Sequence, residues 1–136
     1  MEPGEITMKN KEIIIRDIIS LRGPSIWTYP PSLEAWIDIG EFEDYPTDKL
    51  PGFTQRLAAW LPGMIEHRCS YNERGGFLRR LEEGTWIGHV LEHVALELMT
   101  LGGLPDGFGR TRGTSTRGVY KLVLSNWQDE ITRTAL

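Results

Sequence analysis

The stretch from Thr85 to Gly103 constrains the fold of this chain more than any other part of its sequence. Thr85 is a residue type that caps helices, and Gly102 and Gly103 are residues that end them. We therefore predict a helix from Trp86 to about Leu101. One side of that helix is apolar and must pack on a core. That side comprises Ile87, Val90, Leu91, Val94, Leu98 and Leu101.

The remaining patterns predict strands and shorter helices around this helix. Strands are expected at 12–23, which is rich in β-branched residues, and at 32–42 and 119–127, which alternate apolar and polar residues. Helices are expected at 47–66, capped by Thr47 or Asp48 and bent at Pro62 and Gly63, and at 76–84. Residues 22–32, 41–48, 70–76 and 103–118 are expected to form loops. The predicted fold is α+β, with two or three helices on one face of a mostly antiparallel sheet.

Composition limits the domain organisation and the classes of partner. The 136 residues suit a single domain at 11–136, after a polar leader or expression remnant at 1–10. The abrupt end of the chain suggests a piece of a longer polypeptide. A net charge of -4 gives no reason to expect a nucleic-acid partner. The sequence contains neither a secretory signal nor an apolar run of about 20 residues, so we expect a cytoplasmic protein without a membrane segment.

The helix carries a candidate metal site on the side opposite its apolar residues. His89 and His93 are one helical turn apart, a spacing that lets two imidazoles bind one ion. Glu92 lies beside them as a candidate general base, and His-x-x-Glu-His is the inverted zincin motif. The alternative is a solvated helix side that carries these residues by chance. Trp86 and Leu96 on the same side favour a partly enclosed cleft.

A catalytic zinc ion normally takes three protein ligands and leaves one position for water. His67, the only other histidine, is our first candidate for the third ligand. The alternatives are Glu66, Cys69 and Glu97. Cys69 is the only cysteine, which excludes an internal disulfide, and an inert buried thiol is its simplest role. Glu97 suits a supporting or surface role better than ligation, because about 12 Å of helix separates it from His89.

The glycine-rich segment near the C-terminus offers candidate substrate contacts. Arg110 and Arg112 are suited to binding carboxylates, whereas Arg117 is as easily an ordinary surface residue. The segment lacks the lysine of a phosphate-binding loop. Trp27, in a proline-rich loop, is the tryptophan that we expect to contact a ligand rather than fill the core.

Four stretches together resemble the N-terminal domain of the cyanophycin synthetase family. They are RGPSIW, LPGFTQRLAAWLPGMIEHRCS, GGFLRRLEEGTWIGHVLEHVALEL and GFGRTRGTS, and they cover most of the chain between Leu21 and Ser115. Members of this family join aspartate and arginine into cyanophycin, a poly-aspartate chain with an arginine on each side-chain carboxyl. The resemblance implies ATP-grasp and Mur-ligase-like domains as partners, and this sequence contains neither.

The resemblance implies two functions for the domain itself. One is a zinc-dependent hydrolase that cuts cyanophycin into short primers, with the cutting residues mapping onto His89, Glu92 and His93. The other is a non-catalytic module that holds the polymer, with its β-Asp-Arg repeats, near the active sites of the synthetase. These functions differ in whether Glu92 takes part in chemistry.

Overall fold

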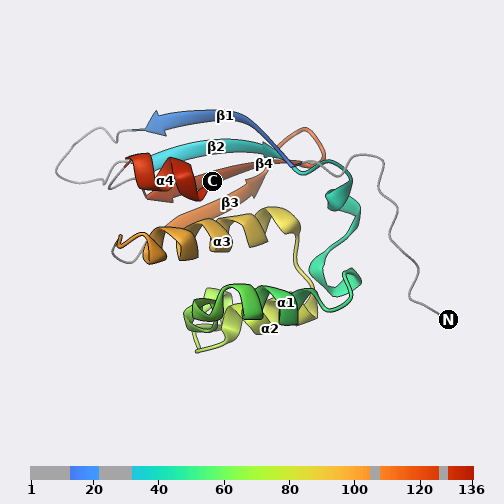
Figure 1. Ribbon diagram of the computed structural model, residues 1–136. Coiled ribbons are helices and arrows are strands. Elements are labelled where there is room, and N and C mark those ends of the chain that lie inside the picture. Colours follow the sequence, from blue (N-terminus) through green and yellow to red (C-terminus); the bar gives the residue numbers. More distant parts are fainter. Residues whose placement is uncertain (1–12, 22–31, 105–107, 126–128) are drawn as a thin grey trace.

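The computed structural model describes residues 13–21, 32–104, 108–125 and 129–136 (Figure 1). Its strands are β1 (Ile14–Leu21), β2 (Ser32–Asp38), β3 (Gly109–Gly113) and β4 (Val119–Ser125). Its α-helices are α1 (Phe53–Trp60), α2 (Gly76–Glu83), α3 (Ile87–Leu101) and α4 (Asp129–Ala135). Short 3-10 helices are η1 (Gly40–Asp44), η2 (Thr47–Lys49), η3 (Pro62–Glu66) and η4 (Cys69–Tyr71). The predicted α+β class is confirmed.

The four strands form one antiparallel sheet in the order β1-β2-β4-β3. β2 alternates as its sequence predicts, with Leu33, Ala35 and Ile37 buried and the residues between them partly exposed. Ala35 pairs with Leu122 of β4, which is also fully buried. The sheet therefore has one apolar face that can support a helix.

The helices form two further layers on that apolar face. Figure 1 shows α3 along the sheet, with α1 and α2 on the far side of α3. The main core contains residues from all three layers, including Ile37 of β2, Val90 of α3 and Phe77 of α2. α4 packs near the C-terminal end of α3, in a smaller cluster with Met99 and Leu124. As a result, α3 is the middle layer and is covered on two sides.

The one-sided packing predicted for α3 is wrong. Leu98 and Leu101, expected in the core, are 38% and 69% exposed, whereas His93 is only 7% exposed. The apolar stripe predicts a single packing surface, but the additional layer formed by α1 and α2 covers the histidine side as well. The pair of histidines therefore lies in the interior between layers.

Two predicted helix caps are also wrong. α1 begins after Gly52, because the Thr47 hydroxyl instead donates to the carbonyl of Leu81 (2.7 Å) and accepts from the amide of Thr85 (2.9 Å). α3 begins after Trp86 without a side-chain cap, and the Thr85 hydroxyl contacts His89. Neither threonine caps the start of an α-helix. Thr47 instead bonds to the backbone of Leu81 and Thr85.

Three of the predicted loops contain regular structure. Part of 41–48 forms η1 and η2, 70–76 includes the end of η4, and 103–118 contains the edge strand β3. The bend predicted near Pro62 is confirmed, since α1 ends at Trp60 and η3 follows. The predicted leader 1–10 and the loop that holds Trp27 lie outside the described residues. Among the residues described, no helix is long and apolar enough to cross a membrane.

Candidate metal centre

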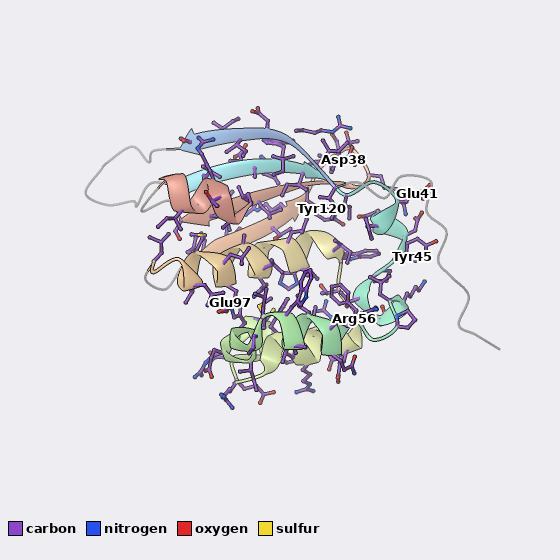
Figure 2. All side chains as sticks on the ribbon, in the orientation of Figure 1. Asp38, Glu41, Tyr45, Arg56, Glu97 and Tyr120 are labelled. Carbon is purple, nitrogen blue, oxygen red and sulfur yellow. The ribbon has the colours of Figure 1, made fainter. Side chains whose placement is uncertain are left out.

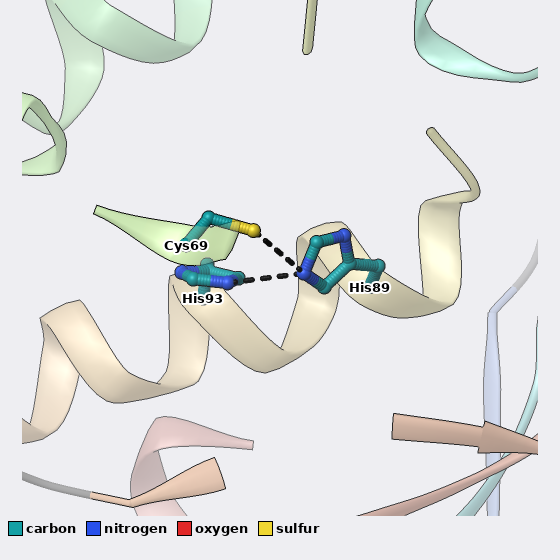
Figure 3. Close-up of side chains that lie close together, drawn as sticks. All are labelled: Cys69, His89 and His93. Atoms are coloured by element: carbon teal, nitrogen blue, oxygen red, sulfur yellow. Dashed lines mark hydrogen bonds between the residues drawn. The ribbon is translucent and has the colours of Figure 1, made fainter. Parts of the chain in front are cut away.

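The two histidines of α3 face each other within the interior of the domain. Their Nε2 atoms are 3.1 Å apart, as the spacing of one helical turn allows (Figure 3). Phe77 of α2 supports both rings: it stacks on His93 with centroids 3.9 Å apart and meets His89 edge-on at 5.7 Å. Their positions are therefore fixed by packing from a neighbouring helix.

Cys69 brings a third donor atom to this pair from η4. Its Sγ lies 3.6 Å from Nε2 of His89 (Figure 3). Cys69 has a φ of 52°, a left-handed conformation that is uncommon for a residue with a side chain. Such strain is concentrated at functional sites. The backbone here holds the thiol beside the histidines at a conformational cost.

The donor atoms of Cys69, His89 and His93 are close enough together to hold a zinc ion. All three lie within 4.8 Å of one another. Neighbouring ligand atoms of tetrahedral zinc, with bonds of about 2.0–2.3 Å, are separated by about 3.3–3.8 Å. The observed 3.1 and 3.6 Å are close to that range. Two imidazoles and a thiol are also donor types that zinc prefers.

His67, the first candidate from the sequence, approaches from a different direction. Its Nδ1 lies 2.9 Å from Nδ1 of His93, the ring nitrogen that does not face His89. Its Nε2 lies 3.4 Å from Oε2 of Glu97. Glu66 is exposed and pairs with Arg74. Of the four candidates, Cys69 is the residue that this geometry brings to the Nε2 side of the histidine pair.

Glu92 lies next to the same ring nitrogens and is buried, with 6% exposure. Its Oε2 is 3.6 Å from Nε2 of His93, and its Oε1 accepts a hydrogen bond of 2.6 Å from the hydroxyl of Thr111 in β3. Burial raises the pKa of Glu92, opposed by this hydrogen bond and by the charge of Arg110. A carboxyl with a raised pKa beside the candidate metal ligands suits a general base.

Burial has the opposite effect on the two histidines and keeps them neutral. The pKa of His93 is lowered to about 3, first by burial and then by electrostatic repulsion between its protonated ring and the neighbouring His89 and His67 rings. The pKa of His89 is lowered by burial and then by Arg80. A neutral imidazole has a lone pair available for a metal ion. Both side chains are therefore in the protonation state that ligation requires.

A pocket of about 440 Å³ opens beside this cluster. His89 and Glu92 line it from α3, Arg110 lines it from β3, and Trp86 and Tyr120 form part of its remaining wall. Trp86 is 48% exposed, so its ring extends this wall towards solvent. A substrate could reach Glu92 through this opening, with Arg110 available to bind an anionic group.

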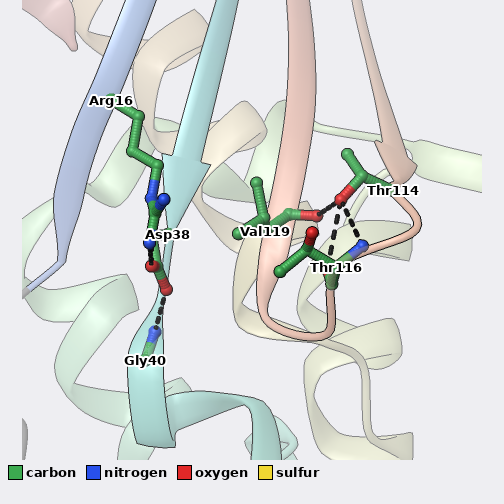
Figure 4. Close-up of polar contacts among 6 residues, drawn as sticks. All are labelled: Arg16, Asp38, Gly40, Thr114, Thr116 and Val119. Carbon is green, nitrogen blue, oxygen red and sulfur yellow. Dashed lines mark hydrogen bonds and ion pairs between the residues drawn. The ribbon is translucent and has the colours of Figure 1, made fainter.

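Arg112 does not line that pocket. It pairs with Lys121 on the sheet face that the described helices leave uncovered, and both line a second pocket of about 410 Å³ with Arg16 and Trp36. Figure 4 shows the turn at one end of this pocket, where Thr114 donates to the carbonyl of Val119 (2.8 Å). The two arginines expected to bind substrate thus line different pockets.

Sequence reasoning missed three contributors to the cluster. Thr85 contacts Nδ1 of His89 at 3.0 Å, Thr111 binds Glu92, and Phe77 supports both rings. Thr85 resembled an ordinary helix cap, and Phe77 an ordinary core residue. Thr111 stands between two arginines in a segment without a local strand signal. No single-sequence pattern identifies such partners, because they come from α2, from the connection before α3 and from β3.

The fold and cluster define the chain as an α+β domain with a His-x-x-Glu-His sequence on its central helix. Residues 34–136 match the family described as the cyanophycin synthase-like N-terminal domain, and the chain belongs to that family. It is 44% identical over 118 residues to a cyanophycin synthetase of Geminocystis herdmanii. It is 43% identical over 119 residues to those of Crocosphaera subtropica and Synechocystis sp..

These similarities cover most of this chain but little of its relatives. The matches span 85% of the chain for the Geminocystis protein and 86% for the other two. In each case they span 14% of the relative. The relatives named as synthetases are therefore much longer than the region shared with this chain.

Proposed function

We propose that this domain is a zinc-dependent hydrolase that cuts cyanophycin into short fragments, which serve as primers for its polymerisation. One observation carries the proposal: the donor atoms of Cys69, His89 and His93 converge within 4.8 Å beside the carboxylate of Glu92. Metal-dependent hydrolysis needs this combination of ligands and base. Similarity to cyanophycin synthetases supplies the substrate class.

The residues have distinct roles in this proposal. His89, His93 and Cys69 hold the zinc ion. When bound, zinc supplies Lewis acidity, polarising a carbonyl and making water acidic enough to attack near neutral pH. Glu92 takes the proton of the attacking water and passes it to the leaving amine. Thr111 orients Glu92 by its 2.6 Å hydrogen bond.

Substrate binding would use the pocket beside the cluster. The polymer carries a carboxylate and a guanidinium on every arginine branch, so a site for it needs both charges. Arg110, on the wall of the pocket, is placed to bind a branch carboxylate. Binding there would bring a backbone carbonyl towards the Glu92 side of the histidine pair.

The uncovered sheet face favours a second candidate function, a non-catalytic hold on the polymer. Arg16, Arg112 and Lys121 surround Trp36 there, and Nζ of Lys121 lies 4.8 Å from the centre of the indole ring. Cations around an aromatic ring suit carboxylates and stacked guanidinium groups. This surface lies on the opposite side of the sheet from α3, so the two functions are compatible.

Incubation of the chain with insoluble cyanophycin and zinc tests the hydrolase proposal. We expect soluble β-Asp-Arg fragments, and a loss of about 10²–10⁴-fold in their rate of release for Glu92→Gln. The variant should keep one equivalent of zinc, because Glu92 is not a ligand. Glu82→Gln, a change of the same type on the exposed side of α2, should release fragments at the unmodified rate.

The outcomes separate the two functions. Equal release by Glu92→Gln and the unmodified chain would remove Glu92 as the base. No release by either, together with co-sedimentation of the chain with cyanophycin, would favour the holding function. Loss of co-sedimentation in Arg112→Ala, with unchanged cleavage, would assign the holding function to the uncovered sheet face.

A further inference from the structure

Glu97 is a buried carboxylate that the proposed hydrolysis does not use. It is 5% exposed, and its Oε2 forms no hydrogen bond within the described part of the chain. Figure 2 shows it between α3 and the layer formed by α1 and α2. An unsatisfied buried carboxylate oxygen is costly and calls for a physical reason. The nearest candidate partner is Nε2 of His67, at 3.4 Å.

The backbone of η3 leaves room for this carboxylate. A Cβ added at Gly63 would lie 2.7 Å from Oε2 of Glu97, closer than real contacts allow. The φ of Gly63 is not in the left-handed region, so the backbone conformation does not require glycine there. Gly63 is therefore needed because a side chain there would occupy the space of the Glu97 carboxylate.

From Glu97, a continuous series of contacts leads to the proposed zinc ligands. Nδ1 of His67 lies 2.9 Å from Nδ1 of His93. Nε2 of His93 lies 3.1 Å from Nε2 of His89, whose Nδ1 lies 3.0 Å from the hydroxyl of Thr85. Each imidazole uses both ring nitrogens, so a proton placed at one end of the series determines the hydrogen positions that follow.

Glu97 and Thr85, at the two ends of this series of contacts, constrain the hydrogen positions of the histidine rings differently. A carboxylate oxygen only accepts hydrogen bonds, so at the 3.4 Å contact between Glu97 and His67 the hydrogen has to come from Nε2 of His67. Nδ1 of a neutral His67 must then accept, which places the hydrogen of His93 on its Nδ1. The Thr85 hydroxyl both donates and accepts, so it imposes no tautomer on His89 from its own end of the series. Glu97 decides the tautomer of His93.

We propose that Glu97 and His67 are positioning residues that fix His93 with its hydrogen on Nδ1 and the lone pair of Nε2 facing His89 and Cys69. This inference rests on the proposed zinc site and assigns His67 to its support rather than to ligation. A carboxylate behind a ligating histidine orients the ring and raises its basicity. Here a second imidazole separates the carboxylate from the ligand.

NMR of the metal-free chain tests this directly, because ring nitrogen shifts in ¹H–¹⁵N spectra distinguish the two histidine tautomers. Near pH 7.5 we expect the hydrogen of His93 on Nδ1, and a mixture of tautomers in Glu97→Leu. Glu97→Gln keeps a carbonyl acceptor and should preserve the unmodified pattern. A His93 with its hydrogen on Nε2 in the unmodified chain would overturn the proposal. This NMR measurement of the His93 tautomer requires neither zinc nor cyanophycin.

Zinc titration separates positioning from ligation. His67→Ala and Glu97→Leu should each bind one equivalent of zinc with affinity reduced about 10–100-fold, the usual cost of losing an outer partner of a ligand. Glu97→Gln should stay within a few-fold of the unmodified affinity. Gly63→Ala, which displaces the carboxylate without removing a donor, should weaken binding as Glu97→Leu does.

Two control variants complete the zinc titration. Cys69→Ser should weaken zinc binding much more than His67→Ala, and Glu66→Gln, in the same 3-10 helix as Gly63, should have no effect. Loss of the zinc equivalent in His67→Ala would make His67 a ligand and overturn its positioning role. If the unmodified chain binds no zinc, the proposed hydrolase fails, and the tautomer of His93 still decides the present proposal. Thermal unfolding of each variant confirms that it is folded.

Discussion

The two faces of the sheet use the same strands for different purposes. On the covered face, Leu33, Ala35 and Leu122 are fully buried. On the other face, Trp36 donates to Glu34 (2.8 Å) and lies under the ammonium group of Lys121. Packing fixes the first face, whereas polar and charged contacts at partial exposure organise the second. Substitutions should therefore be costly on the covered side and mild on the other.

Phe77 should give the largest effect, because it lies at the centre of the covered side. It is fully buried and contacts both histidine rings. Phe77→Ala should lower the free energy of unfolding by about 3–5 kcal/mol, measured by urea denaturation. Trp60→Ala is the matched control, since Trp60 is 85% exposed and should change stability by about 0.5 kcal/mol or less. Equal losses in the two variants would contradict the layered core.

The pH dependence of stability provides a second comparison. Burial lowers the pKa of His93 from 6.5 to about 3, so the unfolded chain binds more protons than the folded chain between these values. The free energy of unfolding of the metal-free chain should therefore fall as the pH decreases below about 6.5, by up to a few kcal/mol. The raised pKa of Glu92 acts in the opposite sense, since the folded state then binds its proton more readily.

Urea denaturation at pH 7.5, 6.5 and 5.5 in the presence of a chelator measures this slope. His93→Phe is the appropriate variant, because it keeps an aromatic ring against Phe77 and removes the titrating group. Its slope should be shallower than that of the unmodified chain. If His93→Phe loses stability on acidification as steeply as the unmodified chain, His93 is not the group that causes the pH dependence.

Gly88 tests the contact between α3 and the sheet. A Cβ at Gly88 would lie 2.6 Å from Cγ of Tyr120, a residue of β4 labelled in Figure 2. Gly88→Ala should therefore lower the free energy of unfolding by about 1–3 kcal/mol, despite the better helix propensity of alanine. Gly113→Ala is the control, because a Cβ there meets nothing within 4 Å. An unchanged midpoint for Gly88→Ala would contradict this close packing.

The contrast between the faces also explains which elements the sequence predicts. β2 has a buried residue at every second position, so its alternation is visible locally, and the middle of β4 alternates in the same way at Leu122 and Leu124. β3 consists of GRTRG at the edge of the sheet. It is a strand because it pairs with β4, and not because its residues favour strands. Glycines and arginines in such a segment resemble a loop.

The candidate site also has a part that the sequence predicts and a part that only the tertiary structure shows. The closeness of His89 and His93 follows from helical spacing and is predictable from two positions in the sequence. The placement of Cys69 beside them, and of His67 behind His93, depends on how η3 and η4 fold over α3. Periodicity within α3 contains no information about that layer. Local geometry therefore predicts the pair, and tertiary packing determines its partners.

The smallest effect is expected on the uncovered face of the sheet, at the contact between Lys121 and Trp36. Their separation of 4.8 Å is within the range of a cation–π interaction, which at a partly exposed site is worth about 0.5–1 kcal/mol. Lys121→Ala should cost no more than this, and Lys121→Arg should cost less because it retains the cation. A double-mutant cycle with Trp36→Leu isolates the pairwise energy. A loss comparable to that of Phe77→Ala would mean that this face is also held by packing, and the distinction between the two faces would fail.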